Sequence, residues 1–373
     1  MKIPQTDPHA NYISHQEEIT AAVQRVLQSG CYISGEEVTG FESEFANYVG
    51  ASHSVGVASG TDALKLALQA CNVGAGDLVF TVTHTAVATV AAIETCGATP
   101  VLVDIEADSY TMDADCLRTA LRDHPAGIPR AVVPVHLYGH PANMMDIQQV
   151  AKENGLYIIE DCSQAHGAVL DGQCVGTWGH MSAFSFYPTK NLGALGDGGA
   201  VVTNEAELDE RVRLLSQYGW RERHLSEIAG GNSRLDPLQA AILRVKLPHL
   251  DNENAQRGLL ALRYCELLDT GRIVLPTAGP DVQHVYHQFV IRTPHRDGLS
   301  TYLRDRGVDT AIHYPVPIHL QPAYSGRLPT VGPLTESEST ANEILSLPIY
   351  PELSHEDVAR VARYIHEWLD VNQ

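Results

Sequence analysis

The sequence predicts an α/β fold in which a large domain, built on a mainly parallel sheet covered by helices, precedes a smaller α+β domain. Two observations lead to this prediction. Apolar segments of strand length alternate with helical segments up to about residue 250, as is typical of a parallel sheet with helices on both faces. Beyond that point the alternation stops. We therefore expect a large domain over residues 1–250, including an N-terminal helical segment, and a small C-terminal domain over 251–373.

The first expected element is a helix over 14–30. Ser14 and Glu17 have the spacing of a capping box, and Gly30 can end the helix. The pattern then predicts strands at 54–60 (with a turn), 77–82, 99–105, 129–139, 155–161, 181–186 and 199–204, and helices at 61–70, 86–97, 112–123 and 144–155. In the C-terminal part we expect a polar-faced helix at 250–270, and further strands and helices within 285–293, 299–308 and 354–369.

The charge of the chain excludes several classes of partner. The net charge is −20 at pH 7. A strongly acidic surface repels nucleic acid and anionic lipid, so neither nucleic acid nor a membrane is expected as a partner. No apolar run is long enough to span a bilayer, and the N-terminal residues lack a signal-peptide core. Seven cysteines without a Cys-x-x-Cys pair indicate reduced thiols and a cytoplasmic location.

The 18 histidines include two close pairs, but neither pair has the pattern of a metal site. His136 and His140, and His284 and His287, lack both the glutamate of a His-Glu-x-x-His helix and a cysteine partner. No metal is therefore expected. The sequence also lacks a Walker phosphate loop and a Gly-x-Gly-x-x-Gly motif after a strand, which argues against an ATPase and a Rossmann dehydrogenase.

Lys190 is the residue that first suggests a reaction. It lies in "SFYPTKNLG", between an apolar strand and a turn with glycines at 193, 196, 198 and 199. Most lysines are exposed and only keep a protein soluble. Here the glycines let backbone pack closely around the amine. A partly desolvated amine loses its proton more readily and becomes a nucleophile toward carbonyl groups.

Other polar residues follow strands, at the edge of the sheet where ligands bind in open α/β folds. Asp161 ends one predicted strand, and Gln164 follows it. Ser59, Gly60 and Thr61 begin a helix whose amides and dipole suit an anion, although an ordinary N-cap explains this stretch equally well when taken alone. Three further polar residues are suggestive: Ser185 near the end of the strand predicted at 181–186, and Asn232 and Arg234 just before a helix.

This combination suits pyridoxal 5'-phosphate. The cofactor needs a lysine for its aldehyde, an anionic partner for its ring nitrogen, and donors for its phosphate. Lys190 supplies the first and Asp161 the second. The turn at 59–61, together with Ser185, supplies the donors.

The chain resembles the sugar aminotransferases of the DegT/DnrJ/EryC1/StrS family, which are fold type I pyridoxal-phosphate enzymes. Seven segments match family blocks in order over nearly the whole chain: "SGCYISGEEVTGFESEFANYVG", "SGTDALKLAL", "VPVHLYG", "IIEDCSQAHGA", "FSFYPTKNLGALGDGGAVVTN", "NSRLDPLQAAIL" and "HYPVPIHLQPAY". The resemblance implies transfer of an amino group from glutamate to a nucleoside-diphosphate-linked keto-hexose. The product would be an amino sugar for a glycan, a lipopolysaccharide or an antibiotic.

The resemblance also implies roles for the residues that match the family motifs. Lys190 would form the Schiff base with the cofactor and later move the proton. Asp161 would pair with the pyridine nitrogen, and Gln164 would contact the ring hydroxyl. The phosphate would be held by Gly60, Thr61 and Ser185, and by Asn232 reaching into the neighbouring subunit.

The remaining implied roles concern the sugar and the assembly. Arg234 would lie near the substrate. His313 and Tyr314 resemble residues that the partner subunit contributes to the nucleotide sugar. The family dimerises because each site is completed across the interface, so a homodimer with shared active sites is expected.

One position departs from the family pattern. Many members have an aromatic residue that stacks on the cofactor ring, whereas this chain has Ala86 in the segment "THTAVAT". Either another side chain covers that face, or it is open for a bulky sugar. Similar segments occur in members that act at C3 of a keto sugar, so C3 is favoured over C4 as the position that is aminated.

Two alternatives stay open within the family. A deoxysugar dehydratase is one, although Lys190 favours transamination because those relatives replace the lysine, typically by histidine. A non-catalytic regulatory member is the other, although such a protein could have lost Lys190 or Asp161, and this chain has both. The sequence does not identify the nucleotide, the sugar, or whether C2 bears an acetamido group.

Overall fold

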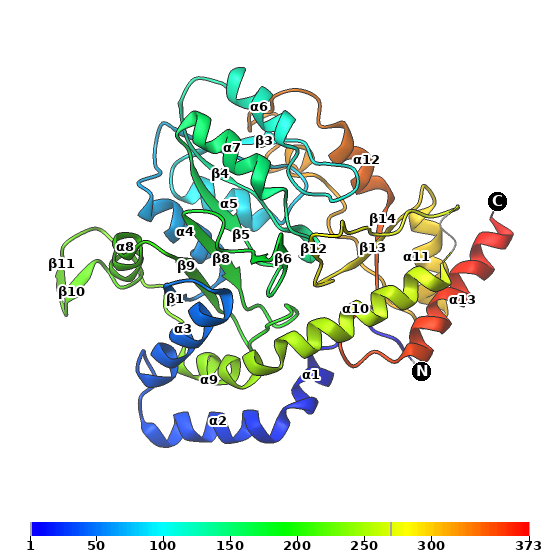
Figure 1. Cartoon of the computed structure of the whole chain (residues 1–373), viewed down its shortest axis with the longest axis horizontal. Helices are drawn as coiled ribbons and strands as arrows, with labels where there is room; N and C mark the ends of the chain where they lie inside the picture. Colours follow the sequence, from blue (N-terminus) through cyan, green and yellow to red (C-terminus); the bar gives the residue numbers. More distant parts are fainter. Residues whose placement is uncertain (1, 269–270, 373) are drawn as a thin grey trace.

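A computed structural model of the chain describes residues 2–268 and 271–372. Its centre is a seven-stranded sheet (Figure 1). The strand order is β1 (His53–Val57), β9 (Gly199–Thr203), β8 (Met181–Ser185), β5 (Tyr157–Asp161), β4 (Ile128–Val133), β2 (Asp77–Val82) and β3 (Thr99–Val103). Only β9 runs antiparallel to its neighbours. The predicted, mainly parallel sheet is confirmed.

Helices cover both faces of this sheet. On one face, the core joins the strands to α4 (Gly60–Ala70), α5 (Val87–Thr95) and α8 (Ala206–Ser216). On the other face lie α6 (Ala114–Arg122) and α7 (Met144–Asn154), and beside them α3 (Glu36–Val49) and α9 (Pro237–Lys246). Strands β2 and β9 are buried along their whole length, as strands covered on both faces must be.

A second core lies in the C-terminal part, at the right of Figure 1. It joins α10 (Leu250–Leu267), α11 (Arg296–Asp305) and α13 (His355–Val371) to the antiparallel pair β13 (Phe289–Arg292) and β14 (Ile344–Leu347). Ile3, from the start of the chain, packs into the same core. The predicted end of the 250–270 helix falls at residues 269 and 270, which lie outside the described residues. The division at residue 250 stays a prediction.

The helix predicted at 14–30 is confirmed as α2 (Gln16–Ser29), with Gly30 as its C-cap, but its predicted capping box is wrong. A separate helix that the sequence analysis missed, α1 (Pro8–Ser14), precedes α2, and Ser14 ends that helix and does not cap α2. Its hydroxyl instead donates to the carbonyl of Ala10 at 3.1 Å, one turn back in α1. The strand predicted at 129–139 ends at Val133, because Pro134 has no N–H for the ladder and a 3-10 turn follows at Leu137–Gly139.

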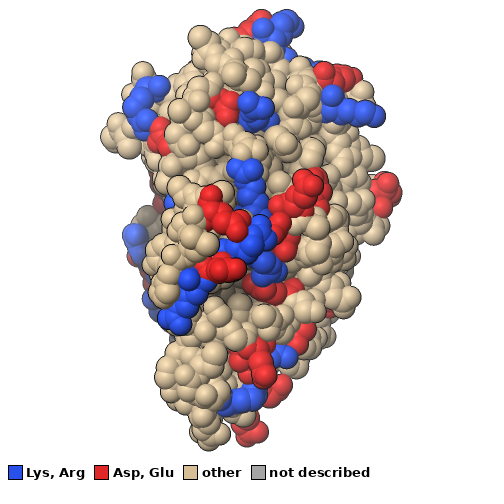
Figure 2. Space-filling model, turned by 90° about the vertical axis from the view of Figure 1, so that its left-hand side faces the viewer, with Lys and Arg blue, Asp and Glu red and all other residues tan. Residues whose placement is uncertain are grey.

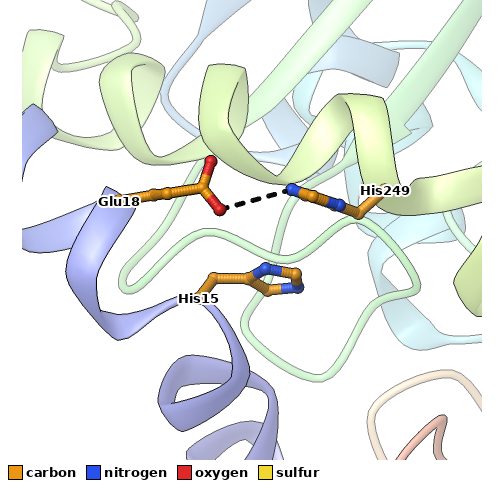
Figure 3. A group of neighbouring side chains, drawn as sticks. All are labelled: His15, Glu18 and His249. Carbon is orange, nitrogen blue, oxygen red and sulfur yellow. Dashed lines mark ion pairs between the residues drawn. The ribbon is translucent and has the colours of Figure 1, made fainter.

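The N-terminal helices are held against the start of α10 by paired rings and carboxylates (Figure 3). His15, between α1 and α2, stacks on His249 with ring centroids 4.4 Å apart. His15 Nε2 lies 2.8 Å from a carboxylate oxygen of Glu253, and His249 Nε2 lies 3.7 Å from one of Glu18. These contacts join two helix starts that are more than 200 positions apart in the sequence.

The charged surface is mixed in sign. On the face at the left of Figure 1, where the hairpin of β10 (Trp220–Glu222) and β11 (Leu225–Ser226) projects, basic and acidic side chains interleave (Figure 2). Arg221 of this hairpin pairs with Glu210 and Glu227. In the described part of the chain, no helix has the length and apolar character needed to cross a membrane.

Candidate active site

The predicted site residues gather in one pocket of about 330 Å³ at the carboxyl ends of β5 and β8. Eight of the ten line it: Gly60, Thr61, Asp161, Gln164, Ser185, Lys190, His313 and Tyr314. A larger hollow of about 740 Å³ lies at the opposite, amino ends of β4 and β5, and none of the ten lines it. We place the candidate active site in the smaller pocket because the chemically relevant side chains converge there.

Lys190 lies in the loop that follows β8, and its backbone N–H donates to the carbonyl of Tyr187 at 2.9 Å. Burial lowers the pKa of the Lys190 amine to about 8, and the negative charge of Asp161 partly opposes that shift. A larger fraction of the amine is therefore neutral near physiological pH than for an exposed lysine. A neutral amine is the form that attacks a carbonyl carbon.

Asp161 is the last residue of β5, the strand beside β8. Its side chain is buried and accepts two hydrogen bonds. The Thr89 hydroxyl donates to Oδ2 at 2.9 Å, and the Ser163 amide donates to Oδ1 at 3.2 Å. A carboxylate in a buried position needs such donors, and it remains available to a cationic group in the pocket.

The start of α4 forms the cradle expected for a phosphate. Ser59 is the N-cap, and its hydroxyl accepts from the Asp62 amide at 3.2 Å. A Cβ at Gly60 would lie 2.5 Å from the Cβ of Ser185, so only glycine lets Ser185 approach the helix start this closely. A helix N-terminus offers amides and a favourable dipole to an anion, and Ser185 adds a hydroxyl. These residues fit a phosphate group.

Gln164 connects the pocket wall to the C-terminal region. Its Oε1 accepts from the backbone amide of Tyr138 at 2.7 Å, and its Nε2 donates to the hydroxyl of Tyr314 at 3.1 Å. The Tyr138 hydroxyl donates to the carbonyl of His313. These bonds hold the 313–314 segment over the same pocket as Asp161.

His313 and Tyr314 therefore line the pocket of their own chain, and the expectation that they contribute to the partner subunit's site stays a prediction. Burial and the charge of Lys190 lower the pKa of His313 to about 4. Burial and the charge of Asp161 raise the pKa of Tyr314 to about 12. Both side chains are therefore neutral at physiological pH. Position in the sequence could not show this, since it depends on how the C-terminal region packs on the sheet.

The structure does not bring Asn232 and Arg234 into this pocket. Asn232 lines a separate hollow of about 350 Å³ beside α4. Arg234 lies over the Tyr218 ring at 5.7 Å from the ring centre, and its Nε has no hydrogen-bond partner among the described residues. Between them, Ser233 donates to Asp62 at 2.7 Å and so braces the start of α4. The sequence analysis missed Ser233.

The small side chain of Ala86, at the N-cap of α5, forms part of the pocket wall together with Ala88. His84 does not line the pocket. It is fully buried and its Nε2 lies 2.8 Å from the Tyr138 hydroxyl. His287 and Gln288, which the sequence analysis also missed, complete the wall from the C-terminal region.

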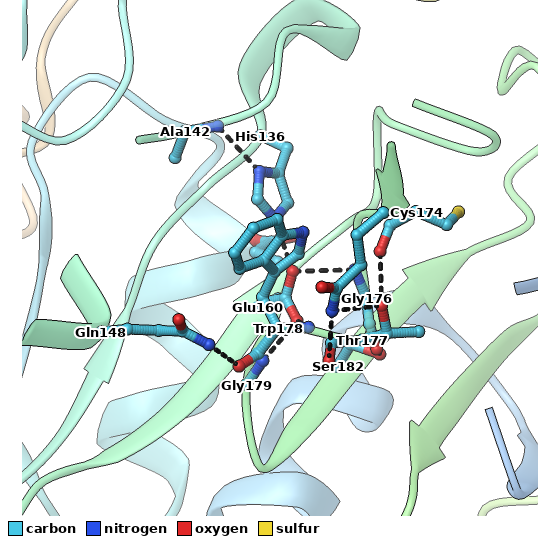
Figure 4. Close-up of polar contacts among 12 residues, drawn as sticks. His136, Ala142, Gln148, Glu160, Cys174, Gly176, Thr177, Trp178, Gly179 and Ser182 are labelled. Atoms are coloured by element: carbon cyan, nitrogen blue, oxygen red, sulfur yellow. Dashed lines mark hydrogen bonds and ion pairs between the residues drawn. The ribbon is translucent and has the colours of Figure 1, made fainter. Parts of the chain in front are cut away.

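Glu160, the residue before Asp161 in β5, has a fully buried carboxylate (Figure 4). Glu160 Oε2 accepts from the Gly176 amide at 2.7 Å and from His136 Nε2 at 3.0 Å. Its Oε1 accepts from the amides of Trp178 and Gly179 at 2.8 and 2.7 Å. Although Glu160, His136 and Cys162 are close enough to surround a metal ion, these bonds already occupy the carboxylate. We interpret the group as a structural brace for the end of β5.

A model of the DegT/DnrJ/EryC1/StrS aminotransferase family matches residues 14–366. The chain belongs to this family. It is 46% identical, over 99% of its length and 97% of the relative's, to dTDP-3-amino-3,4,6-trideoxy-alpha-D-glucose transaminase of Streptomyces venezuelae. It is 48% identical, over 95% of its length and 96% of the relative's, to a protein of Saccharopolyspora erythraea named erythromycin biosynthesis sensory transduction protein EryC1.

A solved structure of the same family has the same fold. The crystal structure of Streptomyces venezuelae DesV in complex with a ketimine intermediate superposes with a TM-score of 0.94 at 47% identity, covering 98% of both chains. The fold type I architecture and the aminotransferase family expected from the sequence motifs are confirmed. The individual roles of the pocket residues stay predictions.

Proposed function

We propose that this protein is a pyridoxal-phosphate-dependent aminotransferase that moves an amino group from glutamate to a nucleoside-diphosphate-linked keto-hexose, with C3 favoured over C4. The observation that carries the proposal is the convergence of Lys190, Asp161 and the start of α4 in one pocket. When bound, the cofactor supplies an aldehyde for covalent attachment and an electron-accepting ring.

The pocket residues have distinct parts in this proposal. Lys190 attaches the cofactor and then, as a free amine, carries a proton to and from the substrate carbon. Asp161 holds the proton on the ring nitrogen. The start of α4 and Ser185 bind the phosphate, while Gln164 orients the ring. His313, Tyr314 and Arg234 remain our candidates for contact with the sugar nucleotide.

The second half of the proposal concerns the assembly. We propose a homodimer in which Asn232 reaches the phosphate of the neighbouring subunit. Its support is that Asn232 lies outside its own chain's pocket, in a hollow beside α4, on the segment that Ser233 fastens to that helix. A residue so placed can serve a second copy across a twofold interface.

Attachment is tested directly by reduction. Purified protein incubated with pyridoxal phosphate is treated with borohydride, digested and analysed by mass spectrometry. We expect the added mass on Lys190, a yellow protein before reduction, and neither result for Lys190→Ala. A reduced adduct on another lysine, or none, would contradict the assignment. An assay for transfer of the amino group from glutamate to a nucleotide keto-sugar distinguishes the alternatives. An aminotransferase gives the amino sugar, whereas a regulatory protein or a dehydratase does not.

The preference for C3 rests on the small residue Ala86 in the pocket wall. It is supported by the name of the Streptomyces venezuelae relative, which specifies a 3-amino sugar. A matched pair of substrates, a 3-keto and a 4-keto nucleotide hexose, decides the point. We expect the new amine at C3 when the products are examined by NMR. Amination of the 4-keto compound alone would overturn the preference and leave the aminotransferase assignment standing.

A further inference from the structure

A chain of two hydroxyls leads from the start of α5 to Asp161. The Thr89 hydroxyl lies 2.9 Å from Asp161 Oδ2, and the Thr85 hydroxyl lies 3.1 Å from that of Thr89. Thr85, Thr89 and Asp161 are all buried, with 2%, 1% and 5% of their surfaces exposed. Solvent therefore cannot replace these bonds, and a lost donor leaves a carboxylate oxygen with one partner fewer.

The chemistry of the groups sets the direction of this chain. An ionised carboxylate only accepts hydrogen bonds, so the Thr89 hydroxyl must donate its single proton to Asp161. The Thr85 hydroxyl must then be the donor to Thr89. The positive, hydrogen ends of both O–H bonds therefore point toward the carboxylate, and hydroxyls aligned in this way polarise one another. The arrangement stabilises the negative charge of Asp161.

Thr89 also restricts the orientation of that carboxylate. It is the third residue of α5, where the side chain of a β-branched residue has few rotamers. The Ser163 amide holds the other oxygen at 3.2 Å, so the two donors together fix the plane of the group. Neither donor is a cation. The charge of Asp161 is oriented without being neutralised, and it remains available to a positive group in the pocket.

We propose that Thr89 is a positioning residue that holds the Asp161 carboxylate correctly oriented toward the cofactor's ring nitrogen. The inference rests on the proposed function, because the role of Asp161 belongs to that proposal. It goes beyond it by assigning a role to a residue that the family resemblance and the sequence analysis leave without one.

The chain contains a matched control. Thr81 on β2 is also fully buried, and its hydroxyl donates to the carbonyl of Val133 at 2.9 Å. Thr81→Val removes a buried threonine hydroxyl from the same sheet without touching Asp161. Thr89→Val removes the donor to Asp161 with the same change of shape. Thr89→Ser restores a hydroxyl at the same position.

The test measures cofactor binding and spectrum as well as turnover. For Thr89→Val we expect cofactor affinity and kcat each to fall about tenfold, since a hydrogen bond to a charged group is lost. We also expect the pH at which the absorbance of the bound cofactor changes to shift. Thr89→Ser should recover most of the loss. Thr81→Val should lower thermal stability and leave affinity and spectrum unchanged.

The outcomes separate this inference from the proposed function. If the wild-type protein binds no cofactor, the proposed function itself fails. If the wild type binds it and Thr89→Val matches Thr81→Val in affinity and spectrum, only the role of Thr89 is overturned. Should Thr89→Val not fold, the same comparison is made between Thr89→Ala and Thr89→Ser, and equal affinity of those two variants overturns the role.

Discussion

Gln164 donates a hydrogen bond to the hydroxyl of Tyr314 at 3.1 Å, although the two residues are 150 positions apart in the chain. The bond spans from the carboxyl end of β5 to the segment after α11, so it connects the large sheet to the C-terminal region within one subunit. His313 and Tyr314 therefore contribute to the site that contains Lys190 of the same chain.

This contact gives a prediction for mixed dimers. Lys190→Ala subunits mixed with His313→Ala subunits should recover no activity. In such a mixed dimer, the only subunit that retains Lys190 has the His313→Ala change in the same pocket. Lys190→Ala mixed with Asn232→Ala should recover about a quarter of the wild-type activity at random exchange, because half of the twofold dimers then have one complete site. Subunit exchange is verified by native mass spectrometry. Recovery in the His313 mixture would place that residue across the interface.

The lowered pKa of Lys190 predicts how cofactor attachment depends on pH. Only the neutral amine attacks the aldehyde, so the attachment rate of the apoprotein should rise with pH and level off above about 8. Since Asp161 raises this pKa, Asp161→Asn should move the midpoint to lower pH. Stopped-flow absorbance measures the rate. Lys246→Met is the control and should leave the attachment rate unchanged. Burial also lowers the pKa of Lys246 to about 8, but this lysine lies outside the pocket. A midpoint near 10.5 would contradict the prediction.

The charge of Asp161 predicts a separate effect on turnover. Asp161→Asn keeps the shape of the side chain and its bond from Thr89, but it removes the charge that holds the ring nitrogen protonated. We expect the variant to retain cofactor and to lose turnover severely, by about a hundredfold or more. Steady-state kinetics on the loaded variant checks this. Turnover within about twofold of wild type would show that another group has this role.

Much of the fold could be predicted because apolar periodicity is local. A short apolar run in the sequence predicts each strand of the central sheet. In a parallel sheet the carboxyl ends of the strands lie at the same edge. Asp161 ends β5 and Lys190 follows the neighbouring strand β8, so topology alone predicts that they converge. The start of α4 joins them for the same reason.

Other features depended on contacts that no local pattern records. Thr89 meets Asp161 across 72 positions, and Glu160 meets His136 across 24. Ser14 has the sequence of a cap, yet the chain turns at His15, and the Ser14 hydroxyl bonds within α1. In each case tertiary packing decides which of several possible partners a polar side chain takes.

Gly60 gives a steric prediction about the phosphate cradle. A Cβ at this position meets the backbone and side chain of Ser185 at 2.5–3.1 Å, so Gly60→Ala must push the helix start and Ser185 apart. We expect cofactor affinity to fall by about tenfold or more, because the helix start and Ser185 would both bind the phosphate less well. Gly258, in α10, has open space for a Cβ, so Gly258→Ala should raise thermal stability slightly and leave affinity unchanged. Fluorescence titration with the cofactor compares the two, and equal affinity would argue against this cradle.

The last prediction concerns the brace at the end of β5. Glu160→Gln replaces one carboxylate oxygen by an NH₂ group, which then faces donors in either orientation. On one side it meets the amides of Trp178 and Gly179. On the other it meets the Gly176 amide and His136 Nε2, which carries a proton because Nδ1 accepts from the Ala142 amide at 2.9 Å.

We therefore expect Glu160→Gln to destabilise the protein by about 3 kcal/mol, the cost of buried donors left without an acceptor. Glu153→Gln, at an exposed position on α7, should change stability by less than about 0.5 kcal/mol. Urea unfolding of the apoproteins followed by circular dichroism gives both values. Because the brace holds the end of β5 that bears Asp161, the Glu160 variant should also bind cofactor more weakly. Equal unfolding midpoints for the two variants would show that the end of β5 does not depend on this carboxylate.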